Sequence, residues 1–214
     1  MNTSPAALRK EYSSQTLLEH DVAANPVEQF SRWWQQATTS EIVEPNAMTL
    51  ATASVDGMPS ARIVLLKGFD EKGFVFFTNY TSYKAIQLNE NPKACLVFFW
   101  KELERQVRIV GLVKKLPSDQ SSDYYSSRPL GSRIGAWASP QSQVIESRKW
   151  LDEQYNKTAG ELNEKEIERP PFWGGYVVQP VIIEFWQGRP SRLHDRIQYS
   201  LQENGLWKIE RLAP

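Results

Sequence analysis

The sequence predicts a mainly β protein, an antiparallel barrel that is closed or nearly closed, with a few flanking helices. Seven or eight short segments have the apolar, β-branched and aromatic composition of strands, and tight turns separate them. These segments do not alternate regularly with helices, which argues against a parallel α/β sheet. Closure into a barrel is favoured because it removes exposed strand edges.

The first half of the chain begins with an arm and a helix. Residues 1–20 are polar and predict a flexible arm, whereas residues 21–214 fit a single domain with a sizeable core. A helix is expected to start near Pro26, because the apolar residues from there to Trp34 recur at helical spacing. Strands are then expected at 48–54, 61–67 and 74–78, and a short helix at 82–89.

The second half continues with strands and two further helices. Asn91-Pro92 ends the short helix, and Asn204-Gly205 predicts a hairpin turn near the C-terminus. Strands are expected at 94–100, 105–115, 176–179, 182–187, 197–201 and 206–211, helices at 118–127, capped by Ser118, and at 143–157, and a surface loop at 159–171.

The composition limits the class of protein. Lys+Arg and Asp+Glu both number 25, and this balance argues against a general nucleic-acid binder. Cys95 is the only cysteine and lies in an apolar run, which is typical of a buried reduced thiol in a cytosolic protein. With two histidines and one cysteine, no metal site of the usual zinc kind is expected. No apolar stretch approaches the roughly 18 residues of a membrane span, and no signal peptide is evident, so we expect a soluble, cytoplasmic protein without membrane contact.

Two groups of cationic and hydroxyl side chains indicate sites for anions. Thr78 and Lys84 lie where an expected strand gives way to a helix, and backbone N–H groups converge at such a helix N-terminus. Tyr124, Arg128 and Ser132 form the second group, in which the arginine fork suits phosphate. Each residue alone is more often a surface charge, but together the groups suggest two phosphorylated ligands.

A third group surrounds one histidine. His194 lies between Arg192 and Arg196, whose charges favour its neutral form at pH 7, and a neutral imidazole can accept or relay a proton. Arg192 and His194 are two residues apart, so on an extended segment both side chains point to one side and Leu193 points to the other. The alternative is a solvated surface histidine, with Trp186 as ordinary core.

These residues carry a resemblance to a known family. Ile183-Glu184-Phe185-Trp186-Gln187, followed after four residues by Arg192-Leu193-His194-Asp195-Arg196, resembles the signature of the pyridoxamine 5′-phosphate oxidase family. The similarity extends from about Arg9 to Pro214, and further blocks are Arg62-Ile63-Val64-Leu65-Leu66-Lys67, Glu104-Arg105-Gln106-Val107, Ser127-Arg128-Pro129, Ile134-Gly135-Ala136-Trp137, Gln141-Ser142, Phe172-Trp173-Gly174-Gly175 and residues 207–214.

The resemblance implies an FMN-binding split barrel over residues 21–214. It further implies a homodimer in which the flavin lies at the interface and contacts both subunits. The implied FMN contacts are Arg62, Ile63, Val64, Leu65, Leu66, Lys67, Phe77, Thr78, Lys84, Gln106, Gln141, Ser142, Trp186 and Arg196. The implied substrate contacts are Lys67, Tyr124, Arg128 and Ser132 for the phosphate, Arg192, Leu193 and His194 at the pyridoxyl ring, and Arg9, Lys10, Glu11 and Tyr12 from the arm.

The implied activity is that of an FMN-dependent oxidoreductase. Pyridoxamine 5′-phosphate or pyridoxine 5′-phosphate is oxidised by oxygen to pyridoxal 5′-phosphate with formation of hydrogen peroxide, and Arg192 and His194 are the implied catalytic residues. The flavin supplies the redox chemistry in such enzymes. Two positions depart from the family pattern, because Tyr83 stands where an arginine is common and Glu44 where an aspartate is common.

Two other functions are compatible with the fold. A non-catalytic split-barrel protein would bind FMN or pyridoxal phosphate as a carrier or sensor, but it is expected to lack the substrate-phosphate group or the Arg192–His194 pair. A flavin reductase would instead use a nicotinamide donor.

Overall fold

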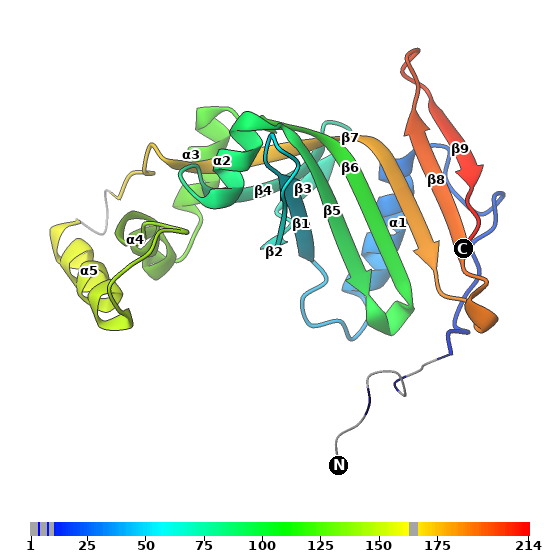
Figure 1. Cartoon of the computed structure of the whole chain (residues 1–214), viewed down its shortest axis with the longest axis horizontal. Coiled ribbons are helices and arrows are strands. Elements are labelled where there is room, and N and C mark those ends of the chain that lie inside the picture. Colours follow the sequence, from blue (N-terminus) through cyan, green and yellow to red (C-terminus); the bar gives the residue numbers. More distant parts are fainter. Residues whose placement is uncertain (1–3, 5–7, 9–10, 163–166) are drawn as a thin grey trace. The chain divides into compact units, whose positions relative to one another are not determined.

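The computed structural model describes residues 4, 8, 11–162 and 167–214, and these contain five α-helices, two 3-10 turns and nine strands (Figure 1). The helices are α1 (Pro26–Thr38), α2 (Tyr83–Glu90), α3 (Ser118–Ser126), α4 (Leu130–Ala138) and α5 (Arg148–Glu161), and the 3-10 turns are η2 (Lys101–Leu103) and η3 (Pro190–Arg192). The strands are β1 (Ala47–Ala53), β2 (Pro59–Leu65), β3 (Gly68–Asp70), β4 (Gly73–Asn79), β5 (Lys93–Trp100), β6 (Arg105–Lys115), β7 (Trp173–Gln187), β8 (Asp195–Leu201) and β9 (Trp207–Arg211).

The nine strands form one hydrogen-bonded sheet. Its order is β2-β1-β5-β6-β7-β4-β3, and β8 pairs with β7 and with β9. The pairs β3–β4, β4–β7, β7–β8 and β8–β9 are antiparallel, as the sequence predicts. No helix of the described ranges is long and apolar enough to cross a membrane.

Contacts divide the chain into two compact units. Unit 1 comprises Met1–Thr49, Cys95–Gly111 and Pro180–Pro214, and unit 2 comprises Leu50–Ala94 and Leu112–Gln179. The expectation of one domain over residues 21–214 stays a prediction.

In unit 1 the core forms where α1 meets the strands. Asn25 caps the helix by accepting the N–H groups of the first turn, and Pro26 occupies the position where its missing N–H costs nothing. Phe30 is fully buried, with its ring centroid 5.2 Å from that of Phe98 on β5. The ring of Trp33 meets Phe185 on β7 edge-on at 5.2 Å. The predicted helix is therefore confirmed, and burial of its aromatic stripe holds it in place.

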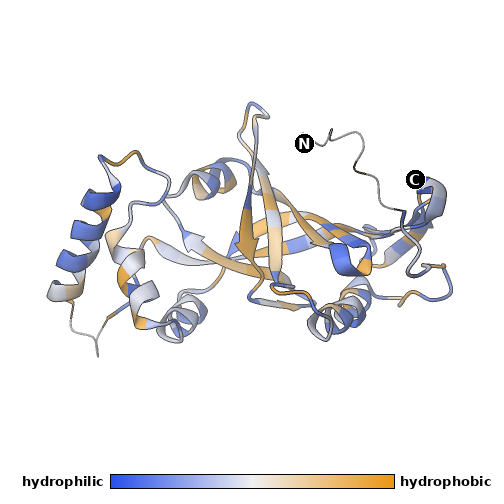
Figure 2. Ribbon diagram, turned by 90° about the horizontal axis from the view of Figure 1, so that it is seen from below, coloured by the Kyte–Doolittle hydropathy of each residue, from blue (hydrophilic) through white to orange (hydrophobic). Residues whose placement is uncertain are grey.

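In unit 2 an aromatic stack forms beside the paired strands β4 and β7. Phe77 stacks on Tyr124 at 3.9 Å and on Trp173 at 5.5 Å between ring centroids. Gly175 leaves room for the ring of Phe77, because a Cβ at this position would lie 2.8 Å from Phe77 Cε1. Gly174 makes room in the same way for the side chain of Tyr80. Helix α5, none of whose described residues is buried, is coloured mostly as hydrophilic in Figure 2.

One strand prediction needs correction at a proline. The strands expected at 176–179 and 182–187 are a single strand, β7. Pro180 lies between the residues paired with β4, which end at Val178, and those paired with β8, which start at Ile182. Neither of these two ladders needs the N–H group that proline lacks, so the strand continues through it.

The remaining differences concern short elements and helix ends. Strand β3 has three residues, too few for a recognisable alternation. Helix α4 was not predicted, because it contains two glycines and follows Pro129 closely. Helix α5 starts at Arg148 rather than at residue 143, because Ser147 caps it, and it extends into the expected loop. Ser118 is the first residue of α3 and not its cap.

Candidate functional site

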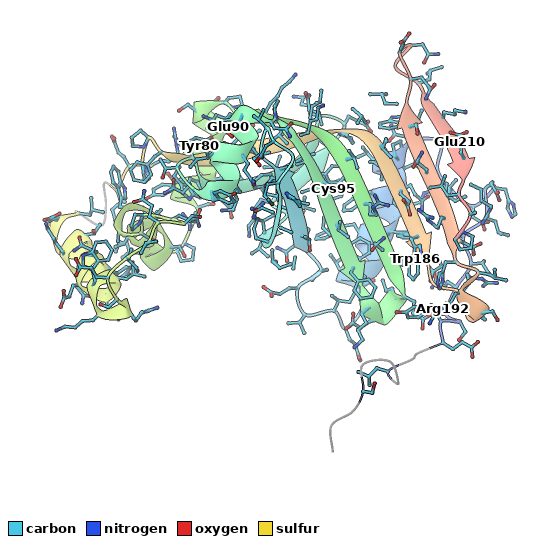
Figure 3. All side chains as sticks on the ribbon, in the orientation of Figure 1. Tyr80, Glu90, Cys95, Trp186, Arg192 and Glu210 are labelled. Carbon is cyan, nitrogen blue, oxygen red and sulfur yellow. The ribbon has the colours of Figure 1, made fainter. Side chains whose placement is uncertain are left out.

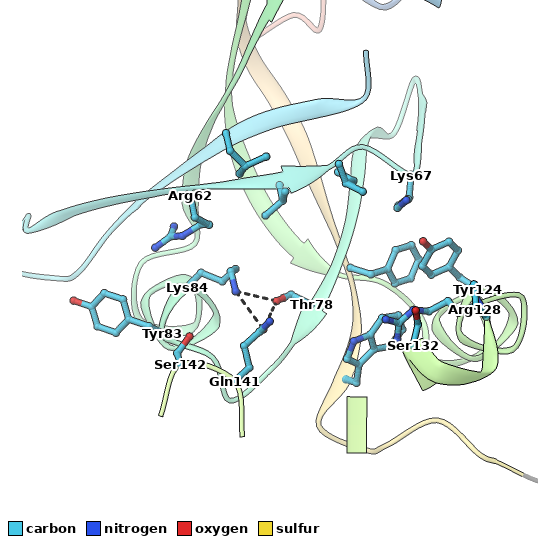
Figure 4. A pocket seen from close by; sticks show the side chains of 16 residues that line it. Arg62, Lys67, Thr78, Tyr83, Lys84, Tyr124, Arg128, Ser132, Gln141 and Ser142 are labelled. Carbon is cyan, nitrogen blue, oxygen red and sulfur yellow. Dashed lines mark hydrogen bonds between the residues drawn. The ribbon is translucent and has the colours of Figure 1, made fainter. Parts of the chain in front are cut away.

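A cavity of about 750 Å³ in unit 2, here called the cationic pocket, collects both predicted anion groups (Figure 4). Its cationic side chains come from β2, the segment after it, α2 and the segment before α4. The described residues that line it are Arg62, Ile63, Val64, Leu65, Lys67, Phe77, Thr78, Tyr83, Lys84, Tyr124, Arg128, Pro129, Ser132, Gln141, Ser142 and Trp173.

Lys84 is the most buried cation of this pocket, with 8% exposure. Its Nζ donates to Thr78 Oγ1 at 3.2 Å and to Gln141 Oε1 at 3.3 Å (Figure 4). It also donates to Ser82 Oγ at 3.2 Å. All three acceptors are neutral. Burial, followed by repulsion from Arg62, lowers the pKa of Lys84 to about 8.

Arg62 is oriented in the same way, by neutral oxygens. Its Nη1 donates to Leu50 O at 3.2 Å and to Thr52 Oγ1 at 2.7 Å, and its Nη2 donates to Ser60 Oγ. Burial lowers the pKa of Arg62, and the interaction with Tyr83 offsets this shift only in part.

The second anion group lies against the aromatic stack. The guanidinium of Arg128 sits 4.6 Å from the ring centroid of Trp173, and its Nη1 is buried without a hydrogen-bond partner. Burial lowers the pKa of Arg128 as well. A buried donor without a partner costs about 1–3 kcal/mol, so this atom favours a ligand that accepts a hydrogen bond.

The charge balance of the cationic pocket indicates an anionic ligand. The described lining contains four cationic side chains, from Arg62, Lys67, Lys84 and Arg128, and no carboxylate. Phosphate groups fit this donor set, since arginine binds them through its planar fork and lysine as a point charge. The resemblance implies two ligands, FMN and a phosphorylated substrate, and each would bring one phosphate group to the pocket.

A second cavity, of about 970 Å³, lies in unit 1 and is here called the His194 pocket. Trp186 on β7 and Arg192 in the following turn lie near each other at one end of this unit (Figure 3). The ring centroid of His194 is 4.6 Å from that of Trp186 and 6.1 Å from that of Tyr12. The described lining consists of Leu8, Glu11, Tyr12, Arg189, Ser191, Arg192 and His194.

His194 is held in a defined orientation. Its Nδ1 accepts the backbone N–H of Arg189 at 3.1 Å, which assigns the proton of the neutral imidazole to Nε2. Burial and, less strongly, the charge of Arg192 lower the pKa of His194. The predicted direction is thus confirmed, although burial rather than the arginines is the main cause.

The backbone before His194 differs from the extended segment expected from the sequence. Residues Pro190–Arg192 form the turn η3, and Ser191 and Arg192 have φ of 57° and 61°. These left-handed conformations cost on the order of 1–3 kcal/mol each for residues other than glycine, and they cluster at functional sites. Arg192 and His194 nevertheless line the same pocket, whereas Leu193 is 69% exposed and lies outside its lining.

The remaining predicted residues divide between the two units. Leu66 is buried beside the cationic pocket without belonging to its described lining, and Gln106, Trp186 and Arg196 lie in unit 1. Arg196 donates from Nε to Glu184 Oε1 at 2.9 Å and from Nη1 to Ala213 O at 2.7 Å. Arg9 and Lys10 lie outside the described residues. The role of each of these side chains stays a prediction.

Several residues of the two sites escaped the sequence analysis. Pro129 and Trp173 line the cationic pocket, and Tyr83, noted only as a departure from the family pattern, lies there half exposed. Trp173 belongs to a block that resembles the family, which was its only signal. Glu44, the other departure, lines neither pocket among the described residues.

Comparison with known proteins identifies the family. Residues 35–158 match the family model described as pyridoxamine 5′-phosphate oxidase, and residues 173–214 match that of the pyridoxine 5′-phosphate oxidase C-terminal dimerisation region. A pyridoxine/pyridoxamine 5′-phosphate oxidase from Nostoc punctiforme is 55% identical, with both chains fully covered. Its counterpart from Salinibacter ruber is also 55% identical over 98% of each chain.

The chain belongs to the pyridoxamine 5′-phosphate oxidase family. PhzG from Burkholderia lata 383, solved in complex with tetrahydrophenazine-1-carboxylic acid, is 30% identical with a TM-score of 0.87, covering 94% of this chain and all of its own. An FMN-binding protein from Nostoc punctiforme PCC 73102 shares the fold at 18% identity and a TM-score of 0.74, over 90% of this chain and all of its own. The predicted family, the split-barrel fold class and the assignment as an oxidoreductase are confirmed.

Proposed function

We propose that this protein is an FMN-dependent oxidase of pyridoxamine 5′-phosphate or pyridoxine 5′-phosphate that uses oxygen and forms pyridoxal 5′-phosphate and hydrogen peroxide. The observation that carries the proposal is the cationic pocket, with four cations, no described carboxylate and two separate groups of phosphate-type donors. Membership of the oxidase family supports it.

The two donor groups would hold two different phosphates. Arg62 and Lys84, oriented by neutral oxygens, would bind the FMN phosphate, and the backbone and side chains of the 62–67 segment with Gln141 and Ser142 would contact the rest of the cofactor. Lys67, Tyr124, Arg128 and Ser132 would bind the substrate phosphate. Bound FMN would supply the redox chemistry that couples oxidation of the substrate to reduction of oxygen.

In the homodimer proposed below, the His194 pocket of one copy would receive the pyridoxyl ring of a substrate whose phosphate is held by the cationic pocket of the other copy. Arg192 can donate to the ring 3-oxygen and so fix the C4′ carbon in position, which is an orientation effect. His194, neutral and held through Nδ1, can donate from Nε2 or take part in proton transfer at the substrate. Tyr12 would contact the ring from the N-terminal side.

We further propose that the protein acts as a cytoplasmic homodimer whose two copies complete each flavin site. The match of residues 173–214 to a dimerisation region supports this. So does one face of β5 and β6 in unit 1, on which Phe99 is 54% exposed and Val97 and Val110 are half-buried, with Gln106 and Arg108 beside them. A sheet face that combines uncovered apolar side chains with polar ones is typical of a subunit interface.

The pKa of Lys84 predicts how FMN binding depends on pH. A phosphate dianion binds the charged amine more tightly, and with a pKa of about 8 this charge is progressively lost as the pH rises above 8. The dissociation constant of FMN for the flavin-free protein is therefore expected to rise above pH 8 by up to about tenfold per pH unit. Fluorescence titration from pH 7 to 10 measures it.

Two controls separate this effect from a general loss of binding. Riboflavin lacks the phosphate and should show no such dependence. Lys84→Arg should bind FMN with a flat profile, because the guanidinium does not titrate in this range. A slope that persists in Lys84→Arg would assign the effect to another group.

One assay tests the proposed reaction against its alternatives. The purified flavin-loaded protein is mixed with pyridoxamine 5′-phosphate in air, and pyridoxal 5′-phosphate and peroxide are measured. Pyridoxal 5′-phosphate and peroxide are expected in equal amounts. Dephosphorylated pyridoxamine should react poorly, because it has no phosphate for Arg128 and the neighbouring donors to bind. Arg128→Ala should mainly raise KM, since the phosphate is bound alike in ground and transition states. Flavin reduction by a nicotinamide donor alone, or bound flavin without turnover, would contradict the oxidase.

A further inference from the structure

The segment of residues 11–19, here called the strap, is docked in unit 1 at several points, and its N-terminal part is held by the buried carboxylate of Glu104. Further along, Asp195 accepts the N–H of Leu17 at 3.1 Å, and Arg189 and Arg211 donate to the carbonyl oxygens of Gln15 and Leu17. Glu104 is 5% exposed, and its Oε2 accepts the backbone N–H groups of Ser13 at 2.9 Å and Ser14 at 3.0 Å. The next residue, Arg105, is 3% exposed and donates to Gln15 Oε1. Two adjacent charged residues at the start of β6, Glu104 and Arg105, thus hold three successive residues of the strap, 13–15, through charge-assisted hydrogen bonds.

The same glutamate also holds the segment that follows β7. The carbonyl oxygen of Glu104 accepts the N–H of Gly188 at 2.8 Å and the Nε2 of Gln187 at 3.2 Å. Its backbone lies in the left-handed region, with φ of 54° and ψ of 41°. One residue therefore joins the strap, through its side chain, to the end of β7, through its main chain.

Gly188 leaves the space that the Tyr12 ring occupies. A Cβ at position 188 would lie 2.7 Å from Cγ, 2.8 Å from Cβ and 2.9 Å from Cδ2 of Tyr12, closer than real Cβ atoms approach. The ring placed in this way meets Trp186 edge-on at 5.8 Å and lies 6.1 Å from His194. No other side chain is among the three nearest atoms to that Cβ, so an alanine there would act on Tyr12.

We propose that Glu104 and Gly188 are positioning residues, which fix Tyr12 beside His194 and through it set the affinity of the His194 pocket for the pyridoxyl ring. The proposal rests on the proposed function for the identity of that ligand. Neither residue lines the His194 pocket, and both act from behind Tyr12: Glu104 anchors the strap that carries the tyrosine, and Gly188 admits its ring.

A double-mutant cycle tests the role of Gly188. Gly188→Ala should raise KM for pyridoxamine 5′-phosphate about tenfold with little change in FMN content, and Tyr12→Ala should do the same. Combined with Tyr12→Ala, the Gly188→Ala change should add less than about twofold, because the collision is gone. An equal effect of Gly188→Ala in both backgrounds would overturn the proposal, since a merely structural glycine would behave in that way.

Limited proteolysis tests the anchor without relying on activity. Endoproteinase Glu-C can cut after Glu11 at the start of the strap, and cleavage there requires Tyr12 and Ser13 to leave their places. Glu104→Gln keeps the shape but removes the charge, and should speed this cleavage about tenfold. Glu102→Gln, on the exposed side of the same turn, is the matched control and should cleave at the parental rate.

The kinetic and the cleavage measurements together distinguish a failure of the positioning role from a failure of the proposed oxidase activity. If the parent forms no pyridoxal 5′-phosphate, the proposed function fails, and the cleavage rates of Glu104→Gln and Gly188→Ala still decide whether these residues hold the strap. Parental cleavage rates in both variants would overturn the proposal even in an active oxidase. Faster cleavage in Gly188→Ala that disappears when Tyr12→Ala is added supports it.

Discussion

Arg192→Met and His194→Asn are each expected to lower kcat/KM for pyridoxamine 5′-phosphate by about 10²–10⁴-fold while FMN content stays near the parental level. Both side chains line the His194 pocket, and neither belongs to the described lining of the cationic pocket, where we place the FMN phosphate. Loss of Arg192 removes a donor that orients the ring. Loss of His194 removes a group held in one orientation by the N–H of Arg189.

The pH dependence distinguishes the two side chains. Burial lowers the pKa of His194 below its ordinary value of 6.5, so the imidazole stays neutral at pH 7 and gains its proton only at lower pH. Activity that needs the neutral ring should therefore fall on the acid side of pH 6.5, and this limb should vanish in His194→Asn. The Arg192→Met variant should keep the limb at a lower rate and shift it to higher pH, because the charge of Arg192 contributes to the lowered pKa of His194.

His20→Asn is the matched control for the histidine. His20 is the other of the two histidines in the sequence, and its side chain is 77% exposed. Parental kinetics are expected for it, measured by steady-state turnover with the flavin absorbance recorded for each protein. Parental kinetics in both Arg192→Met and His194→Asn would contradict the catalytic assignment and leave only the flavin-binding part of the proposal.

The sequence predicted the elements whose signals are local. The stripe from Val27 to Trp34 repeats at helical spacing, and its cap and proline mark the start of α1, so the helix was recognised. The turn at Asn204-Gly205 was recognised because glycine tolerates the φ of +79° found there. By contrast, α4 contains two glycines and carries no capping side chain, and nothing in its residues distinguished it from a loop.

The resemblance to the family also predicted which cationic residues belong to the site. It did not predict the backbone geometry that orients them. The left-handed φ of Ser191 and Arg192 cannot be read from residue types that normally avoid that region. The prediction that Arg192 and His194 share a side succeeded, although its premise of an extended segment was wrong.

Contacts between distant residues were beyond sequence reasoning for a different reason. The bonds from Glu104 to the strap join residues about 90 positions apart, and a lone glutamate in a resembling block gives no hint of them. Likewise, Leu50 and Thr52 on β1 orient Arg62 on β2 only because the two strands are neighbours in the sheet.

Arg62→Ala is expected to purify with little FMN and to bind added FMN about 10²–10⁴-fold more weakly. The guanidinium is held by neutral oxygens of Leu50, Thr52 and Ser60, which direct it but leave its charge for a ligand. Charge-assisted hydrogen bonds contribute about 1.5–3 kcal/mol each, and an arginine that binds phosphate through its fork makes two. Lys84 would then face the dianion alone, with an amine that loses its charge above pH 8.

The expected loss is specific to the phosphate, and the measurements are chosen to show this. The ratio of flavin to protein absorbance gives the FMN content after purification, and fluorescence titration of the flavin-free protein gives the dissociation constants of FMN and riboflavin. Arg62→Ala should weaken the binding of FMN strongly and that of riboflavin little, so that the two affinities converge.

Two further variants serve as controls. The FMN affinity of Arg62→Lys should fall between those of the parent and Arg62→Ala, because an ammonium supplies the charge without the fork. Arg32→Ala, which removes an exposed arginine paired with Glu28 on α1, should bind FMN as the parent does. Parental FMN affinity in Arg62→Ala would move the cofactor phosphate away from β2, and the carboxylate-free lining around Lys67 and Arg128 would then be its remaining place in the described pocket.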